Sequence, residues 1–199
     1  GPKAIEALPD LLKALRTQKP FSPSACQALG RIGPQSIPGL VQLIQPKNKR
    51  YKRSIFWALR SYKLPAAEAM LKAIRKAKST PHQLMFLQGI QSFGTQAAKL
   101  APRLKVFLYH NEPVIRKEAI KTIVGMGPNT VPLLKKLFPT LLIDVRLTAV
   151  EKILDQSHMA ALLPLLLQDR AKQVRKKTLT KFGYSSFRRR KFKQLIPYL

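Results

Sequence analysis

The chain has 199 residues, and 37 lysine and arginine residues against 9 aspartate and glutamate residues give it a formal net charge of +28. Hydrophobic residues make up 45% of the sequence, which is enough for a core and excludes a largely disordered chain. The single cysteine, Cys26, excludes an internal disulfide framework and a multi-cysteine metal site. No apolar run approaches the ~20 residues that cross a bilayer, and no secretory signal is evident. We expect a soluble intracellular protein (cytoplasm or nucleoid, or the nucleus in a eukaryote) with an acidic partner.

A small residue recurs about every 30 residues along the chain, and this spacing indicates an internal repeat. In the last three copies the small residue belongs to a six-residue segment, as in 145–150. The segment begins with a branched apolar residue and an arginine, continues with two variable residues, and ends with the small residue and an aliphatic one. The members of the series are Ala28, Ala58, Gly89, Ala119, Ala149 and Thr178. Apolar residues around them fall at helical spacing, and the alternation typical of strands is absent. Each position therefore predicts a helix, which we call helix A.

A second series places an aliphatic residue or alanine directly before a proline. Its members are Leu8, Ile37, Ala101, Val131, Leu163 and Ile196, and the spacing predicts a further member near residue 69, where no proline stands. Proline is tolerated in the first helical turn, so the series marks the starts of second helices, which we call B. Glycines such as Gly33, Gly94 and Gly127 lie between the two series and predict turns.

The fold class that follows is all-α, with a single repeat domain over 1–199. An N-terminal helix at 3–19 lacks an A partner, and we expect the chain to be a fragment of a larger protein. Six repeats follow, with approximate bounds 22–47, 52–77, 81–109, 112–138, 143–168 and 171–199.

The pattern Val-Arg-x-x-Ala, then Gly-x-Gly-Pro, then x-Pro-x-Leu resembles the short HEAT-like repeats of the kind found in phycobilisome lyases. This resemblance implies a right-handed α-solenoid of about six helix pairs, with the B helices lining its concave wall. The repeat arginine is absent from the first three units, where Ala25, Ile55 and Phe86 replace it, so a bridging role for it there is not expected. The aspartate that precedes Val-Arg in the family is retained as Asp144.

Polar residues three or four positions past the proline position of each B helix are the first candidate site. They are Lys13, Gln42, Lys72, Lys105, Lys136 and Gln168, and Arg75 and Lys76 follow Lys72 on the same helix. On the implied concave wall they would form a cationic track for phosphates. The competing interpretation is that any outward helix face carries polar residues and that lysine is a good helix former. Glu68 is expected to pair with Lys72 one turn later.

Two denser basic clusters extend the candidate site. One is the link with Lys47, Lys49, Arg50, Lys52 and Arg53, and the other is Arg188, Arg189, Arg190, Lys191 and Lys193. Lysine and arginine suit phosphates because each contact releases condensed counterions. Phe187 and Phe192 stand among the second set, either to stack on unpaired bases or as core residues of the last repeat. A localisation signal is a further interpretation of either cluster.

These features predict a non-catalytic module, monomeric or part of a larger chain, that binds the nucleic-acid backbone, DNA rather than RNA. The alternative is a scaffold that docks an acidic protein. A second alternative comes from resemblance to HEAT-like glycosylases that remove alkylated bases, but Trp57 has no acid in its repeat and Asp144 is interpreted as a helix cap. No nucleotide loop, zinc motif or nucleophile elbow occurs, so no cofactor, metal or catalytic residue is expected.

Overall fold

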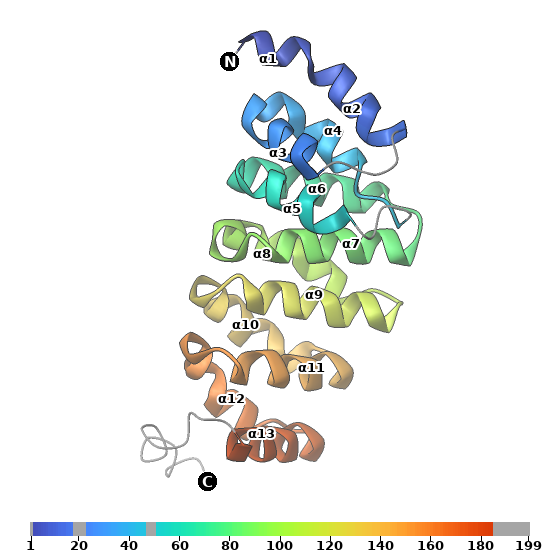
Figure 1. The fold of residues 1–199 in the computed structure, drawn as a ribbon. Coiled ribbons are helices and arrows are strands. Elements are labelled where there is room, and N and C mark those ends of the chain that lie inside the picture. The colour runs from blue at the N-terminus through green and yellow to red at the C-terminus, as the bar shows by residue number, and fades with distance from the viewer. Residues whose placement is uncertain (1, 18–22, 47–50, 185–199) are drawn as a thin grey trace. The chain divides into compact units, whose positions relative to one another are not determined.

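A computed structural model describes residues 2–17, 23–46 and 51–184. Over these residues the chain is helical and contains no strand, which confirms the predicted fold class (Figure 1). None of the helices described here is long and apolar enough to span a bilayer. The chain forms two compact units, Gly1–Ala97 and Ala98–Leu199, and the predicted third repeat falls across their boundary. That the units join in one repeat domain stays a prediction.

Short 3-10 helices, labelled η, stand between many of the α-helices. The first unit contains α1 (Pro2–Glu6), α2 (Leu8–Thr17), α3 (Pro23–Ile32), η1 (Pro34–Ser36), α4 (Ile37–Gln42), α5 (Lys52–Arg60), α6 (Lys63–Lys76) and α7 (Thr80–Gln91). The helix η3 (Gly94–Leu100) spans the boundary. The second unit contains α8 (Ala101–Leu104), η4 (Lys105–Tyr109), α9 (Pro113–Gly125), η5 (Pro128–Thr130), α10 (Val131–Leu137), η6 (Phe138–Thr140), α11 (Ile143–Leu154), η7 (Ser157–Leu162), α12 (Leu163–Leu167) and α13 (Lys172–Tyr184).

The proline series marks helix starts as predicted. Proline is the second residue of α4, α8, α10 and α12. The expected start near residue 69 is wrong, because α6 begins at Lys63 and has Pro65 as its third residue. The N-terminal helix is also divided, with a break at Ala7 between α1 and α2. Pro9 explains that break, since it has no N–H to donate to the carbonyl of Ile5 and its ring crowds the preceding turn.

The small residues of the A helices allow neighbouring helices to approach closely. A Cβ added to Gly30 of α3 would lie 3.2 Å from the Cα of Ala58 on α5, and one added to Gly89 would lie 2.9 Å from Cε1 of Phe56. Ala58, Ala119 and Ala149 are completely buried for the same reason. Ala28 differs, because it is exposed and none of the helices described in the first unit covers it.

In the second unit, arginines tie neighbouring repeats together. Helices α9, α11 and α13 lie side by side (Figure 1), each with an arginine near its start. Nη2 of Arg116 lies 2.9 Å from Oδ2 of Asp144 in the next repeat, while its Nη1 donates to the carbonyls of His110 and Asn111 at 2.8 Å. Nη1 of Arg146 lies 2.5 Å from Oδ1 of Asp169, and both side chains are buried. Each carboxylate therefore links one helix pair to the next.

Among its described residues, the first unit joins its repeats through hydrogen bonds of Tyr62 and Ser61, without an arginine ion pair. The hydroxyl of Tyr62, between α5 and α6 in the second repeat, donates to the carbonyl of Leu29 at 2.5 Å and lies 2.8 Å from Oγ of Ser36. Oγ of Ser61 donates to the carbonyl of Gly30 at 3.0 Å. Neutral hydrogen bonds therefore replace the ion pairs that join repeats in the second unit.

The start of α6 carries backbone strain. Gly33, Gly94 and Gly127 occupy the corresponding turns with φ angles of 140°, 54° and 88°, whereas in this repeat the residue with positive φ is Lys63, the first residue of α6, with φ of 51°. A side chain in this region costs roughly 1–2 kcal/mol, while glycine is accommodated readily.

We expect Lys63→Gly to raise the free energy of unfolding by about 0.5–1 kcal/mol, after allowance for the greater freedom of glycine in the unfolded chain. Urea unfolding measures the change. Lys72→Gly in the middle of the same helix is the control and should lower stability by about 1 kcal/mol. Equal losses for the two variants would contradict a left-handed backbone at residue 63.

We expect Asp169→Asn to lower the free energy of unfolding by roughly 3–5 kcal/mol, because it leaves the buried Arg146 guanidinium without its counter-charge. Asp155→Asn is the matched control, since Asp155 pairs with Lys181 at the surface and its loss should cost about 1 kcal/mol or less. Thermal or urea unfolding compares the two. Similar small losses would show that the Arg146–Asp169 pair does not hold the repeats together.

Candidate nucleic-acid interface

The basic side chains predicted on the B helices point to solvent. On α6 the amphipathic pattern explains why the basic side chains are exposed. Met70, Leu71 and Ile74 form its buried face, and the basic residues stand on the opposite face. The exposed candidates are Lys13 on α2, Lys72, Arg75 and Lys76 on α6, Lys105 at the start of η4 and Lys136 on α10. Gln42 and Gln168, at the equivalent positions of two other repeats, are exposed as well.

Three of these side chains form a cluster on one helix. Lys72, Arg75 and Lys76 follow one another at i, i+3 and i+4, so they share one face of α6. The predicted pair between Glu68 and Lys72 does not form. Lys105 and Lys136 belong to the second unit, on separate elements. A continuous track from one unit to the other stays a prediction.

The link cluster is described only in part. Lys47, Lys49 and Arg50 lie outside the described residues, as does the C-terminal set of Arg188, Arg189, Arg190, Lys191 and Lys193. Arg53 is exposed on α5. Lys52 is half-buried, and its Nζ donates to Oε1 of Gln88 on α7 at 3.0 Å. Lys52 therefore has a structural contact that the sequence did not indicate.

Most acids of the second unit form ion pairs within the chain. Every aspartate and glutamate of that unit except Glu112 forms an ion pair with a lysine or arginine. The pairs are Arg116–Asp144, Lys121–Glu118, Arg146–Asp169, Lys177–Glu151 and Lys181–Asp155. Within the described chain, Lys72, Arg75, Lys76, Lys105 and Lys136 have no acidic partner. Their charge remains available to an anion from outside.

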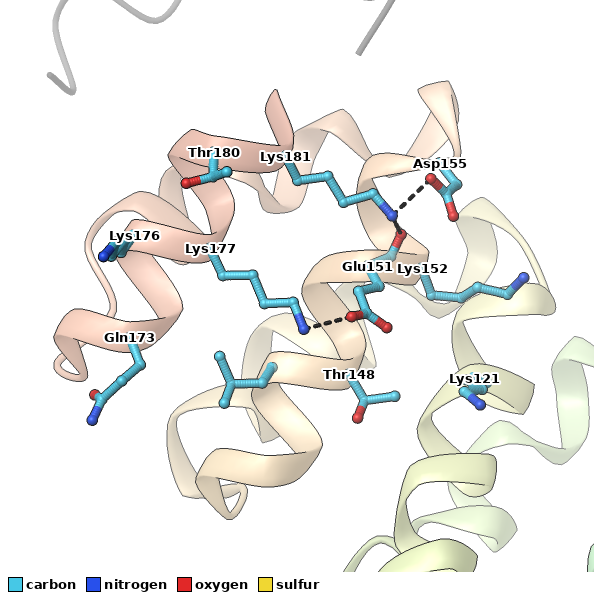
Figure 2. A pocket seen from close by; sticks show the side chains of 11 residues that line it. Lys121, Thr148, Glu151, Lys152, Asp155, Gln173, Lys176, Lys177, Thr180 and Lys181 are labelled. Carbon is cyan, nitrogen blue, oxygen red and sulfur yellow. Dashed lines mark hydrogen bonds and ion pairs between the residues drawn. The ribbon is translucent and has the colours of Figure 1, made fainter. Parts of the chain in front are cut away.

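A groove of about 850 Å³ lies over the A helices of the second unit (Figure 2). Its lysines come from α9, α11 and α13, and they are Lys121, Lys152, Lys176, Lys177 and Lys181. Nζ of Lys177 lies 2.5 Å from Oε1 of Glu151, and Nζ of Lys181 lies 2.9 Å from Oδ1 of Asp155 (Figure 2). Nζ of Lys181 also donates to the carbonyl of Glu151 at 2.7 Å. These two lysines therefore hold α13 against α11.

This groove was not predicted, because the basic residues of the B helices were expected to form the binding surface. The repeat spacing gives no signal for its ion pairs, because they join non-equivalent positions of adjacent helices. Glu151 stands two residues after Ala149, whereas Lys177 stands one residue before Thr178.

The lysines also set the acidity of Glu151. The hydrogen bond from Lys177 holds the pKa of this carboxyl below its ordinary value, and the positive charges of Lys177, Lys181 and Lys121 act in the same direction. Partial burial opposes them. The ionised carboxylate is therefore favoured in the folded chain, and it is the form that binds Lys177.

Few residues offer catalytic or metal chemistry. No group of three or more His, Cys, Asp and Glu side chains suited to a metal occurs in the part of the chain that the structure describes. Cys26 is buried, and burial raises the pKa of its thiol to about 12. The carboxylate of Asp144 binds Arg116 and the backbone N–H of Val145, and that of Asp169 binds Arg146 and the N–H of Ala171.

Comparisons with protein-family models, with curated proteins and with solved structures give no match to this chain.

We expect Lys177→Gln to return the pKa of Glu151 toward its ordinary value of about 4.3, since it removes the largest stabilising contact of the carboxylate. Carboxyl NMR titration measures this directly. Because the folded pKa is depressed, the pair stabilises the fold above the unfolded pKa and loses that contribution as the pH falls through the folded one. Lys152→Gln is the control, and an equal shift in both variants would contradict a specific contact.

Proposed function

We propose that the helix pairs form a right-handed HEAT-like α-solenoid and that this protein binds nucleic acid, DNA in preference to RNA, through its phosphate backbone. One observation carries the proposal. All acids of the second unit except Glu112 are bound in ion pairs, while five exposed bases on described B-helix segments have no acidic partner within the described chain: Lys72, Arg75, Lys76, Lys105 and Lys136. An excess of charge that the chain does not neutralise favours a polyanion as the partner.

The type of contact follows from the side chains. Lysines and arginines on helix faces contact phosphate oxygens and carry little sequence information, because specificity requires contacts to base edges. Each phosphate contact releases condensed counterions, so affinity should fall steeply as salt rises. The proposed activity is therefore binding with weak sequence preference and without catalysis, in an intracellular compartment.

The cluster on α6 is the sharpest place to test this proposal. Lys72, Arg75 and Lys76 lie on one face of a regular helix whose opposite face is buried, so they can be replaced without disturbing the core. Glutamine removes their charge and retains a good helix former.

We expect the triple variant Lys72→Gln, Arg75→Gln and Lys76→Gln to bind duplex DNA up to about tenfold more weakly per lost contact at ~0.1 M salt, for all sequences alike. The dependence of log Kd on log salt should become shallower by about one per lost contact. Fluorescence anisotropy with labelled duplexes at several salt concentrations measures both.

The matched control removes the same charge from A helices of the second unit through Lys117→Gln, Lys172→Gln and Lys176→Gln, all at exposed positions. It should retain most of the affinity. If both triple variants lose the same affinity and the same salt dependence, net charge alone attracts DNA and the B-helix surface is not the site.

A further inference from the structure

Trp57 is an apolar residue at a repeat position that is polar in all the other repeats. The residue directly before the small residue of helix A is polar in every other copy. These residues are Gln27, Gln88, Glu118, Thr148 and Lys177. In α5 the position carries the only tryptophan of the chain, and this residue is 53% exposed. Packing does not account for it, because Ile55, Phe56, Ala58 and Leu59 form the buried face of the same helix.

Two arginines flank Trp57 on the same face. Arg53 stands one turn before it and Arg60 one turn after it, so the three occur at i, i+4 and i+7. Both arginines are exposed. Within the described chain, the indole makes no hydrogen bond or ring contact, and neither guanidinium has an acidic partner. We call Arg53, Trp57 and Arg60 the α5 stripe.

The charge around the α5 stripe has one sign. The A helices of the first unit, α3, α5 and α7, contain no aspartate or glutamate. In the second unit the position equivalent to Trp57 on α9 carries Glu118, and α11 carries Asp144 and Glu151. An exposed indole between two guanidinium groups without acidic partners, on a helix whose neighbouring A helices contain no acid, is complementary to an aromatic ligand with negative charge on either side.

We propose that the α5 stripe binds single-stranded nucleic acid, with a base stacked on Trp57 and phosphates bound by Arg53 and Arg60. The inference rests on the proposed function and adds the recognition of unpaired bases to it. Seven residues of helix separate the arginines by about 10 Å, which corresponds to roughly three stacked nucleotides at ~3.4 Å each. Stacking on an aromatic ring needs an unpaired base, so duplex DNA cannot use this contact.

The single tryptophan makes the proposal directly measurable. Titration of the full chain with an oligothymidylate should quench its intrinsic fluorescence, because the base stacks on the only indole present. A duplex of the same length should quench it much less at equal occupancy, and polyglutamate should not quench it. Quenching by polyglutamate to the same extent as by the oligothymidylate would overturn the site and indicate an acidic protein as its partner.

Replacement of Trp57 tests the same contact by affinity. Trp57→Leu should weaken binding of the oligothymidylate by roughly 5- to 150-fold, the range for loss of one stacked base, and leave duplex affinity unchanged. Trp57→Phe should retain part of the affinity. Tyr109→Leu, which removes an aromatic side chain that is 48% exposed in the second unit, is the matched control and should have no effect on single-strand binding.

The outcomes separate this inference from the proposed function. Suppose that the unmodified chain binds duplex and single-stranded DNA without a change in its tryptophan fluorescence, and that Trp57→Leu binds both as tightly. The α5 stripe is then overturned and the proposed function stands. If no nucleic acid binds at low salt, both fail. Circular dichroism of the variants confirms that they fold, and quenching of the unmodified chain tests the site without any substitution.

Discussion

Arg146 and Asp169 meet inside the second unit, where both side chains are almost completely removed from water. A buried charge without its partner is costly, so each of these residues constrains the other and, through it, the helices that carry them. Arg116 and Asp144 make the equivalent contact one repeat earlier. The same carboxylate of Asp169 also accepts the backbone N–H of Ala171, just before α13. The packing of α9, α11 and α13 against one another thus depends on the carboxylates of Asp144 and Asp169, in a chain that has only 9 acidic residues.

This use of the acids has a consequence for the surface. Carboxylates that bind structural arginines and lysines of the second unit are not available to neutralise Lys105 or Lys136 of the same unit. The groove in Figure 2 illustrates the same constraint, since Glu151 and Asp155 neutralise Lys177 and Lys181 and so join two helices. The excess of 37 basic over 9 acidic residues leaves surface charge that these pairs do not neutralise, and the proposed binding of phosphates follows from that charge.

The periodic features of the sequence predicted most of the helices, because small residues at close helix approaches and prolines at helix starts have local physical causes. Features that depend on tertiary contacts were not predicted. Asp169 stands six residues before Arg175, whereas Asp144 stands two before Arg146, so spacing did not reveal their shared role. The left-handed backbone at Lys63 has no glycine to mark it. The side-chain bond from Lys52 to Gln88 and the pairing of Glu151 likewise require knowledge of which helices adjoin.

The central claim is that the unneutralised surface charge serves to bind a phosphate polymer. The most direct measurement is competition on the full chain, with labelled duplex DNA displaced by single-stranded DNA, structured RNA or polyglutamate of equal charge across a range of salt concentrations. The account predicts that log Kd for DNA varies linearly with log salt and that polyglutamate competes weakly. Displacement by polyglutamate as effective as that by every nucleic acid would contradict it.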